Sequence, residues 1–493
     1  MSYYQSKNFW IAAGFFGFTF VVLFSIRIGL VDKVFSRPKT LTLSSISQLS
    51  EKDIWMNIFQ SDRKIGFSHT RFSKEDTGYR LQETVYMRIN TMGMVQDIHL
   101  KTNGRLNADF TLADLDFEID SGRFSFTVQG AVSGDRLNIE TASAGNRRKI
   151  DLQIQKKPYL LSSIIHAAAS TKLKAGDKFV FHIFDPATMA QLPVYVEAIG
   201  LEEIQVMGTK KTATKVALSL KGASQLAWID DDGDLLKEKG LLGIELVKTN
   251  RHDALYGLAV ESSQDLTKAA SVSSNVSIAN PDRLERLKLE ISGVAFDQLD
   301  LDGGRQMLKD NILIIVKESL LDLVSNLNEN TFGSLEKIFL KPSPFIQSDH
   351  QKIQELALNI LGPHSTATPL GKVQKLIDWV HQNIEKKPVL SLPDALSTLE
   401  NRVGDCNEHA VLLAALARAA GIPCRVEAGL VYLKGRFYYH AWNLVYLGRW
   451  ITADSLFGQL PADVSHVRFV SGSQRQQLDL MGIIGNLQLK VIN

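Results

Sequence analysis

Near its C-terminus the chain reads Gly404-Asp405-Cys406-Asn407-Glu408-His409. Apolar residues then continue at helical spacing until a helix stop at Gly421-Ile422-Pro423. The pattern predicts a helix with Cys406 in its first turn. Free N–H groups and the positive end of the helix dipole favour a thiolate there over a thiol. The same N–H groups can stabilise an oxyanion that forms when the thiolate attacks a carbonyl carbon.

Cysteine usage narrows the chemistry. The chain has two cysteines, Cys406 and Cys424, which excludes a disulfide scaffold and a cysteine-rich zinc site. A lone cysteine is more often a buried structural residue than a nucleophile. Cys424 fits that description, because it starts a predicted strand and has no histidine near it in the sequence. Cys406 differs, because two later segments can supply partners for it.

These two segments are predicted to be neighbouring strands. They read Tyr438-Tyr439-His440-Ala441-Trp442 and Trp450-Ile451-Thr452-Ala453-Asp454. A cysteine nucleophile needs a base in contact, and the base needs a third group that fixes its tautomer. Adjacent strands can present His440 and Asp454 side by side.

The register of the two strands constrains this arrangement. A two-residue turn at Gly448-Arg449 would place Asp454 opposite Asn443, which lies on the other face of the sheet from His440. The two side chains can meet only if the turn has an odd number of residues or one strand carries a bulge. Asp454 then lies opposite Trp442, diagonal to His440 on the same face. We therefore predict an irregular turn here.

With these residues in this order, the C-terminal region resembles the transglutaminase-like superfamily, whose fold is related to papain-type cysteine proteases. The resemblance covers roughly residues 340–470 and rests on residues 402–406, 414–425, 440–442 and 450–454. It implies a triad with Cys406 as nucleophile, His440 as base and Asp454 as orienting residue. It also implies acyl transfer through a thioester, without a metal or other cofactor.

Four further residues are expected to line or support the cleft: Asp405, Asn407, His409 and Trp442. His409 follows Cys406 by one helical turn, and we expect it to pack or cap rather than to touch the site. Trp442 is expected to be a core aromatic that also lines the cleft. A metal site of Cys406, His409, His440 and Asp454 is the less favoured alternative, because their order and flanking sequence suit a triad better.

The resemblance does not give the substrate or the acyl acceptor. Ser455 stands where the family often has proline. Animal transglutaminases use an upstream aromatic residue to hold the oxyanion, and residues 388–403 contain no clear equivalent. The second donor to the oxyanion therefore stays open.

The N-terminus has the composition of a membrane anchor. Residues 9–26 carry no charge, and a run of about 18 to 20 apolar residues matches a bilayer crossing. We expect an uncleaved transmembrane helix at residues 8–30, with a cleaved signal peptide as the alternative. The positive charges after this run favour a cytoplasmic location for the large domain, but long domains are exported largely regardless of charge. We expect a single-pass membrane protein whose large domain is periplasmic or extracellular.

The rest of the chain predicts several domains. Residues 50–265 alternate apolar and polar residues between turn signals, which indicates a β-rich domain, either an antiparallel sandwich or an open barrel. Residues 266–282 have the composition of a linker, and residues 283–335 are predicted to form bridging strands and a helix. Helices followed by strands in residues 336–480 predict an α+β transglutaminase-like domain.

Together these features predict a membrane-tethered, cysteine-dependent acyl-transfer enzyme that acts on peptide or protein amides. Hydrolysis is favoured over crosslinking, because water needs no dedicated acceptor site. The alternatives are a protein-crosslinking transglutaminase and a non-catalytic scaffold of the cell envelope. The net charge of +2 gives no reason to expect nucleic acid as a partner. We expect the β-rich region to position the substrate or to bind an envelope protein.

Overall fold

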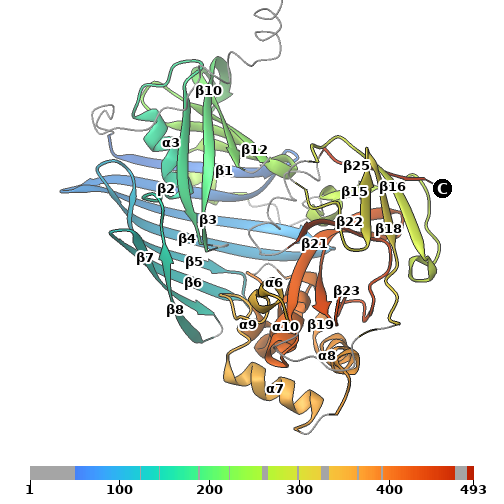
Figure 1. The fold of residues 1–493 in the computed structure, drawn as a ribbon. Helices are drawn as coiled ribbons and strands as arrows, with labels where there is room; N and C mark the ends of the chain where they lie inside the picture. Colours follow the sequence, from blue (N-terminus) through green and yellow to red (C-terminus); the bar gives the residue numbers. More distant parts are fainter. Residues whose placement is uncertain are drawn as a thin grey trace, which may run out of the picture.

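The computed structural model describes residues 50–492 apart from 123, 144, 187–188, 221–222, 258–264, 297–298, 322, 324–331, 364–365, 390–391 and 472–485. The described chain is mostly β. A large sheet forms its N-terminal part, and a mixed helical and stranded region packs beside it, as Figure 1 shows.

The large sheet contains 14 antiparallel strands in the described part of the chain. Their bounds are β1 (Lys52–Gln60), β2 (Arg63–Glu75), β3 (Gly78–Thr91), β4 (Met94–Asn107), β5 (Leu112–Asp120), β6 (Ser125–Ser133), β7 (Arg136–Ser143), β8 (Asn146–Gln153), β9 (Lys178–Asp185), β10 (Ala190–Val206), β11 (Thr209–Leu220), β12 (Ala223–Ile229), β13 (Leu235–Lys239) and β14 (Ile244–Thr249).

The strand order shows that the sheet consists of two meanders. It runs from β8 back to β1, crosses to β14, and continues to β9 at the other edge. The helix α3 (Leu161–Ala169) interrupts the strands between the two meanders. One core includes Leu81 of the first meander, Ile164 of α3 and Phe181 of the second. The sheet therefore bends so that both meanders face α3.

The C-terminal region adds helices and smaller sheets. The helices are α4 (Arg251–Leu255), α5 (Leu266–Ala269), α6 (Ser334–Ile338), α7 (Gln351–Leu361), α8 (Pro369–Asn383), α9 (Ala395–Asn401) and α10 (Cys406–Ala419), with short 3-10 turns at Leu241–Gly243 and Pro281–Arg283. The strands are β15 (Ser271–Ser273), β16 (Arg286–Ser292), β17 (Gln306–Lys309), β18 (Ile312–Val316), β19 (Glu385–Lys386), β20 (Val403–Gly404), β21 (Cys424–Leu433), β22 (Arg436–Tyr446), β23 (Trp450–Ala453), β24 (His466–Ser471) and β25 (Gln488–Ile492).

The helix α10 is the centre of this region. It packs on β22 and is surrounded by α7, α8 and α9. Its side chains are buried on nearly every side, from Cys406 to Ala417. A helix that is apolar all round lies inside a domain, and the run of leucine and alanine in α10 explains this position.

Two sheets complete the C-terminal region. One has the order β15-β22-β21-β24, with β23 also paired to β22, and the other has the order β17-β18-β16-β25. Strand β15 comes from residues 266–282, the segment expected to be a linker, and it pairs with β22 from Ser271↔Tyr438 to Ser273↔Arg436. That segment therefore contributes to the sheet that carries His440.

The predicted fold class needs correction. No helix among the described residues is long and apolar enough to cross a membrane, and the helix expected at residues 8–30 lies outside the described residues. Of the two arrangements predicted for the β-rich region, a sandwich and an open barrel, the sandwich is wrong, because β1 and β14 pair from Trp55↔Thr249 to Gln60↔Ile244 and join the two meanders into one continuous sheet. Alternating side chains specify which face is buried but not which strands pair.

Candidate active site

A capping box fixes the start of α10. The Asp405 carboxylate accepts from the backbone N–H of Asn407 at 2.9 Å and also caps Glu408, whose own carboxylate accepts from the Asp405 N–H at 3.0 Å. Gly404 makes this possible, since a Cβ atom at that position would lie 2.3 Å from the Glu408 Cβ. The predicted helix start is confirmed, and Cys406 occupies its first position.

The Cys406 sulfur lies at an opening along the edge of β22. Strand β15 pairs with residues 436–438 of that edge and β23 pairs with residues 443–446. Neither strand covers His440 and Ala441, and the Ala441 N–H donates a hydrogen bond to the Cys406 sulfur. Cys406 is 8% exposed. The gap in strand pairing therefore admits the first turn of α10 next to the histidine strand.

The electrostatic surroundings of Cys406 differ from the expectation. Burial raises the pKa of the Cys406 thiol well above its usual range, and the charges of Asp405, Glu408 and Asp454 raise it further. The hydrogen bond from the Ala441 N–H lowers the pKa, but it does not outweigh these effects. The helix terminus was expected to favour a thiolate. The N–H groups of Asn407 and Glu408 are already paired with Asp405, and the raised pKa favours the thiol over the thiolate.

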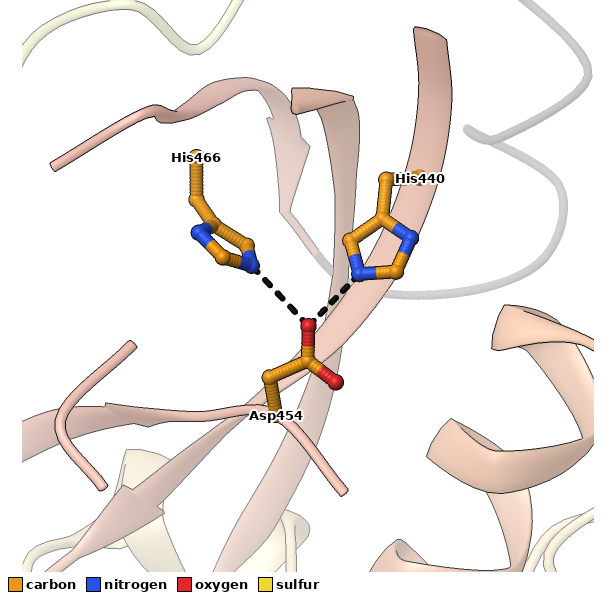
Figure 2. A group of neighbouring side chains, drawn as sticks. All are labelled: His440, Asp454 and His466. Atoms are coloured by element: carbon orange, nitrogen blue, oxygen red, sulfur yellow. Dashed lines mark hydrogen bonds and ion pairs between the residues drawn. The ribbon is translucent and has the colours of Figure 1, made fainter. Parts of the chain in front are cut away.

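His440 and Asp454 are in direct contact. His440 Nε2 lies 2.6 Å from Asp454 Oδ2, and both side chains are buried. Figure 2 shows the contact between them. The His440 ring also stacks on Phe457, with centroids 5.0 Å apart. The second ring nitrogen of His440 points away from Asp454. The carboxylate therefore fixes the tautomer that carries hydrogen on Nε2 and leaves Nδ1 as the basic nitrogen.

Asp454 is held as an anion. Burial alone would raise the pKa of this carboxyl, but the charges and hydrogen bonds of His440 and His466 outweigh burial and hold the pKa well below its usual range. Its other oxygen, Oδ1, accepts from the backbone N–H groups of Leu456 at 2.7 Å and Phe457 at 3.0 Å. Asp454 is thus fully paired and fixed in orientation.

His466 is the site residue that the sequence analysis missed. Its Nε2 lies 2.9 Å from Asp454 Oδ2, the oxygen that His440 also contacts (Figure 2). Its Nδ1 lies 3.2 Å from the Asp463 carbonyl oxygen and 3.3 Å from Asp463 Oδ1. Only an imidazolium can donate from both nitrogens. Burial lowers the pKa of His466, but the bonds to Asp454 and Asp463 outweigh it and raise the pKa overall.

The four supporting residues take structural positions. Asp405 caps α10, and Asn407 Oδ1 accepts from the Tyr439 hydroxyl at 2.9 Å. His409 Nδ1 donates to the Asp405 carbonyl oxygen at 2.7 Å, and burial lowers the His409 pKa to about 4, so its imidazole is neutral. Trp442 donates to Glu427 at 3.1 Å.

The rings of His440 and His466 both lie against Trp442. Its ring centroid is 6.1 Å from that of His440 and 5.2 Å from that of His466. Trp442 is 1% exposed and therefore packs behind the two histidines. It supports their orientation from the core side of the site.

A metal site is geometrically conceivable among His440, Asp454 and His466, whose ligand atoms lie within 4.8 Å of one another. The two contacts to Asp454 Oδ2 measure 2.6 and 2.9 Å, which are hydrogen-bond lengths. A zinc ion needs about 2.0 to 2.2 Å to each ligand and would push these atoms further apart. The arrangement fits a charged hydrogen-bond network better than a coordination shell.

Comparisons with known proteins agree with the C-terminal assignment. Residues 354–455 match the family model of the transglutaminase-like superfamily, a stretch that includes Cys406, His440 and Asp454. The C-terminal region therefore contains a domain of this superfamily. A comparison with curated proteins finds no match.

Three solved structures are similar to parts of the chain. A protein from Cytophaga hutchinsonii, provisionally assigned as a cysteine protease, has 21% identity and a TM-score of 0.29, over 43% of this chain and 83% of its own. The periplasmic domain of TgpA from Pseudomonas aeruginosa, bound to ethylmercury, has 20% identity and a TM-score of 0.23, over 36% and 74%. A beta-barrel-like protein of DUF1849 from Brucella abortus has 11% identity and a TM-score of 0.33, over 41% and 96%.

Proposed function

We propose that this chain is a cysteine-dependent hydrolase of peptide or protein amides that acts through a thioester. The observation that carries the proposal is the contact between His440 Nε2 and Asp454 Oδ2 at 2.6 Å, next to the strand edge where Ala441 meets the Cys406 sulfur. The transglutaminase-like domain at residues 354–455 supports a cysteine enzyme of this class.

The first half of the reaction forms the thioester. His440 Nδ1 takes the proton of the Cys406 thiol, and the sulfur attacks the carbonyl carbon of the amide. The carbonyl π electrons move to oxygen, and a tetrahedral oxyanion forms. When this intermediate collapses, the C–N bond breaks and His440 gives the proton to the departing amine. Asp454 stabilises the imidazolium that exists between the two proton transfers.

The oxyanion needs a hydrogen-bond donor at the start of α10. The capping box uses the N–H groups of Asn407 and Glu408 for the Asp405 side chain. The capping box does not use the N–H of Cys406 itself, which belongs to the same residue as the reacting sulfur. We propose that this N–H holds the oxyanion, as a helix N-terminus can do.

The second half of the reaction consumes water. His440 takes a proton from a water molecule, the hydroxyl oxygen attacks the thioester carbon, and the C–S bond breaks. The products are a carboxylic acid and the Cys406 thiolate, which His440 reprotonates. An amine in place of water would give a new amide, which is the crosslinking alternative.

A comparison of the full chain with its Cys406→Ala variant tests the proposal, and Cys424→Ala is the matched control, since Cys424 is fully buried. Each protein is incubated with a protein mixture and an amine-bearing probe, and products are followed by mass spectrometry. Cleavage that depends on Cys406, without labelling, supports hydrolysis. Labelling that depends on Cys406 identifies amine transfer instead. Identical products from the chain and Cys406→Ala would point to a non-catalytic scaffold.

Two expectations stay predictions. The location of the large domain outside the cytoplasm depends on residues 1–49, which lie outside the described residues. An envelope protein as partner of the β-rich region is likewise a prediction, which co-purification of the full chain would examine.

A further inference from the structure

The curved sheet of the N-terminal part encloses a cavity of about 480 Å³. This volume is within the range of about 300 to 1,000 Å³ that small-molecule sites occupy. Residues of both meanders and of α3 line the cavity, and no residue of the candidate active site is among them. The cavity is therefore separate from that site.

The cavity wall is mainly apolar. Its lining includes Leu100 and Phe117 from the first meander, Leu218 from the second, and Ile165 from α3. Leu161, in the first turn of α3, also lines the cavity and is 49% exposed to solvent. The cavity lining beside α3 is therefore partly in contact with solvent.

Two glutamates interrupt this apolar wall. Glu83 lies on β3 between Thr70 and Thr102 of the neighbouring strands, and Glu238 lies on β13 opposite Leu246. Both glutamates line the cavity, and neither has an ion-pair partner in the described part of the chain. The Ser162 hydroxyl donates a hydrogen bond to the Glu83 carboxyl, and the Gln225 amide donates one to the Glu238 carboxyl.

Burial of these two carboxyl groups lowers the stability of the fold when they are charged. Burial raises the pKa of Glu83, and burial together with the charge of Glu83 raises the pKa of Glu238 to about 7. Unpaired carboxylates on an apolar wall are rare, because their desolvation is not compensated. A perturbed acid in a cavity often marks a functional site.

A third polar group faces the same space. His166 on α3 lines the cavity and is 4% exposed, and its Nδ1 has no hydrogen-bond partner among the described residues. Burial lowers the pKa of His166 to about 4, so its imidazole is neutral. An unpaired nitrogen on a buried side chain indicates a missing hydrogen-bonding partner.

We propose that this cavity binds a small amphiphile with an apolar body and a protonated amine. The apolar body would contact the leucine, isoleucine and phenylalanine side chains. The ammonium group would pair with Glu83 and Glu238, and its positive charge would supply the ion-pair partner that neither carboxylate has among the described residues. A neutral amphiphile would leave the carboxylates unpaired, and an anionic one would be repelled by them.

Equilibrium dialysis of the full chain against three ligands with the same alkyl chain tests this site. The ligands are dodecylamine, dodecanol and dodecanoate, each below its micelle concentration, with bound ligand quantified by mass spectrometry. We expect one dodecylamine per chain, bound at least about tenfold more tightly than dodecanol, because a charge-assisted hydrogen bond contributes on that scale. Dodecanoate should bind most weakly.

The double variant Glu83→Gln/Glu238→Gln should bind dodecylamine and dodecanol equally well. Glu203→Gln, whose side chain is exposed on β10 in an ion pair with Lys210, should keep the preference for the amine. Thr102→Phe fills the cavity and should weaken binding of all three ligands. Circular dichroism verifies that each variant is folded.

Three results would each overturn the proposal. They are an absence of binding to the unmodified chain, dodecanol or dodecanoate binding as tightly as the amine, and an amine preference that survives in the double variant.

Discussion

His440 Nε2 lies 2.6 Å from Asp454 Oδ2, although the two residues belong to strands whose simplest hairpin would have placed them on opposite faces. The pairs Tyr446↔Trp450 and Asn443↔Ala453 define a turn of three residues, 447–449, between β22 and β23. The predicted irregular turn is confirmed. One additional residue in this turn brings the base and the carboxylate to the same side of the sheet.

Alkylation of Cys406 should report its protonation state. Because burial and three carboxylates raise its pKa, the rate of reaction with iodoacetamide should rise steadily above neutral pH. His440→Ala should lower the rate near neutrality by about a hundredfold, the scale of general-base catalysis. Peptide mapping by mass spectrometry gives the rate at each cysteine.

Cys424 provides the internal reference for this measurement. It is fully buried, whereas Cys406 is 8% exposed, and burial raises its pKa to about 12, so a reagent reaches it less easily and it should react more slowly than Cys406 throughout. A rate at Cys406 that is already maximal below neutral pH would show a stable thiolate and contradict the prediction.

His466→Gln should weaken the site without removing any member of the proposed triad. It deletes a cationic partner of Asp454, and hydrogen bonds to charged groups contribute about 1.5 to 3 kcal/mol, so kcat/KM should fall by about tenfold or more. The pKa of Asp454 should rise when this cation is lost, and the acid limb of the pH–rate profile should move to higher pH.

The pH profile separates positioning from mere structural support. A variant that is only less stable would keep the acid limb in place throughout the pH range in which circular dichroism shows it to be folded. An unchanged profile together with unchanged kcat/KM would show that His466 does not act on Asp454. The substrate is a synthetic peptide that spans the amide bond cleaved by the unmodified chain.

Gly404→Ala should destabilise the start of α10. The added Cβ would lie 2.3 Å from the Glu408 Cβ and displace the side chain that closes the capping box. Loss of a cap costs about 0.5 to 2 kcal/mol, which thermal unfolding can detect. Alkylation of Cys406 should change as well, because its position depends on that cap.

Gly371→Ala is the matched control, since Gly371 lies in α8 and its nearest neighbour would be 3.5 Å from a Cβ. This substitution should stabilise the chain by about 0.5 to 1 kcal/mol through helix propensity. Equal effects of the two substitutions would rule out the role assigned to Gly404.

Glu238→Gln should stabilise the protein at alkaline pH. The folded-state pKa of Glu238 is raised to about 7, so the folded chain holds this proton more tightly than the unfolded chain. Its favourable contribution is complete below the ordinary pKa of a glutamate and is lost as pH rises through about 7. The variant should gain about 2 kcal/mol over the unmodified chain at high pH and almost nothing at low pH.

Thermal unfolding between about pH 4 and pH 9 measures this difference. Glu203→Gln should follow the unmodified chain at every pH, since Glu203 is exposed. A Glu238→Gln variant whose advantage does not grow with pH would show that Glu238 is not a strained acid.

The sequence predicted the local features of the site because local chemistry specifies them. Gly404 and Asp405 signal a helix start, and the positions of His440 and Asp454 on two strands imply the register that joins them. His466 could not be found this way. Its contact with Asp454 requires β24 to pair with β21 through Val431↔His466, and no local pattern encodes that pairing.

The arrangement of the β-rich region could not be predicted from the sequence for the same reason. Alternation identified strands but could not distinguish a two-sheet sandwich from one bent sheet. That distinction depends on Trp55↔Thr249 and the pairs beside it, which join residues far apart in the sequence. Likewise, the helix start suggested a lowered pKa for Cys406, while the charges that raise it include Asp454, which arrives from another strand.

The pairing of β1 with β14 also determines where the polypeptide enters and leaves the large sheet. These are its first and last strands in sequence, and because they are antiparallel neighbours, Lys52 and Thr249 lie at the same end of the pair. The polypeptide enters and leaves the sheet at nearly one point. An evolutionary gain, loss or exchange of the whole sheet would therefore hardly change the distance between the two points at which the chain enters and leaves it.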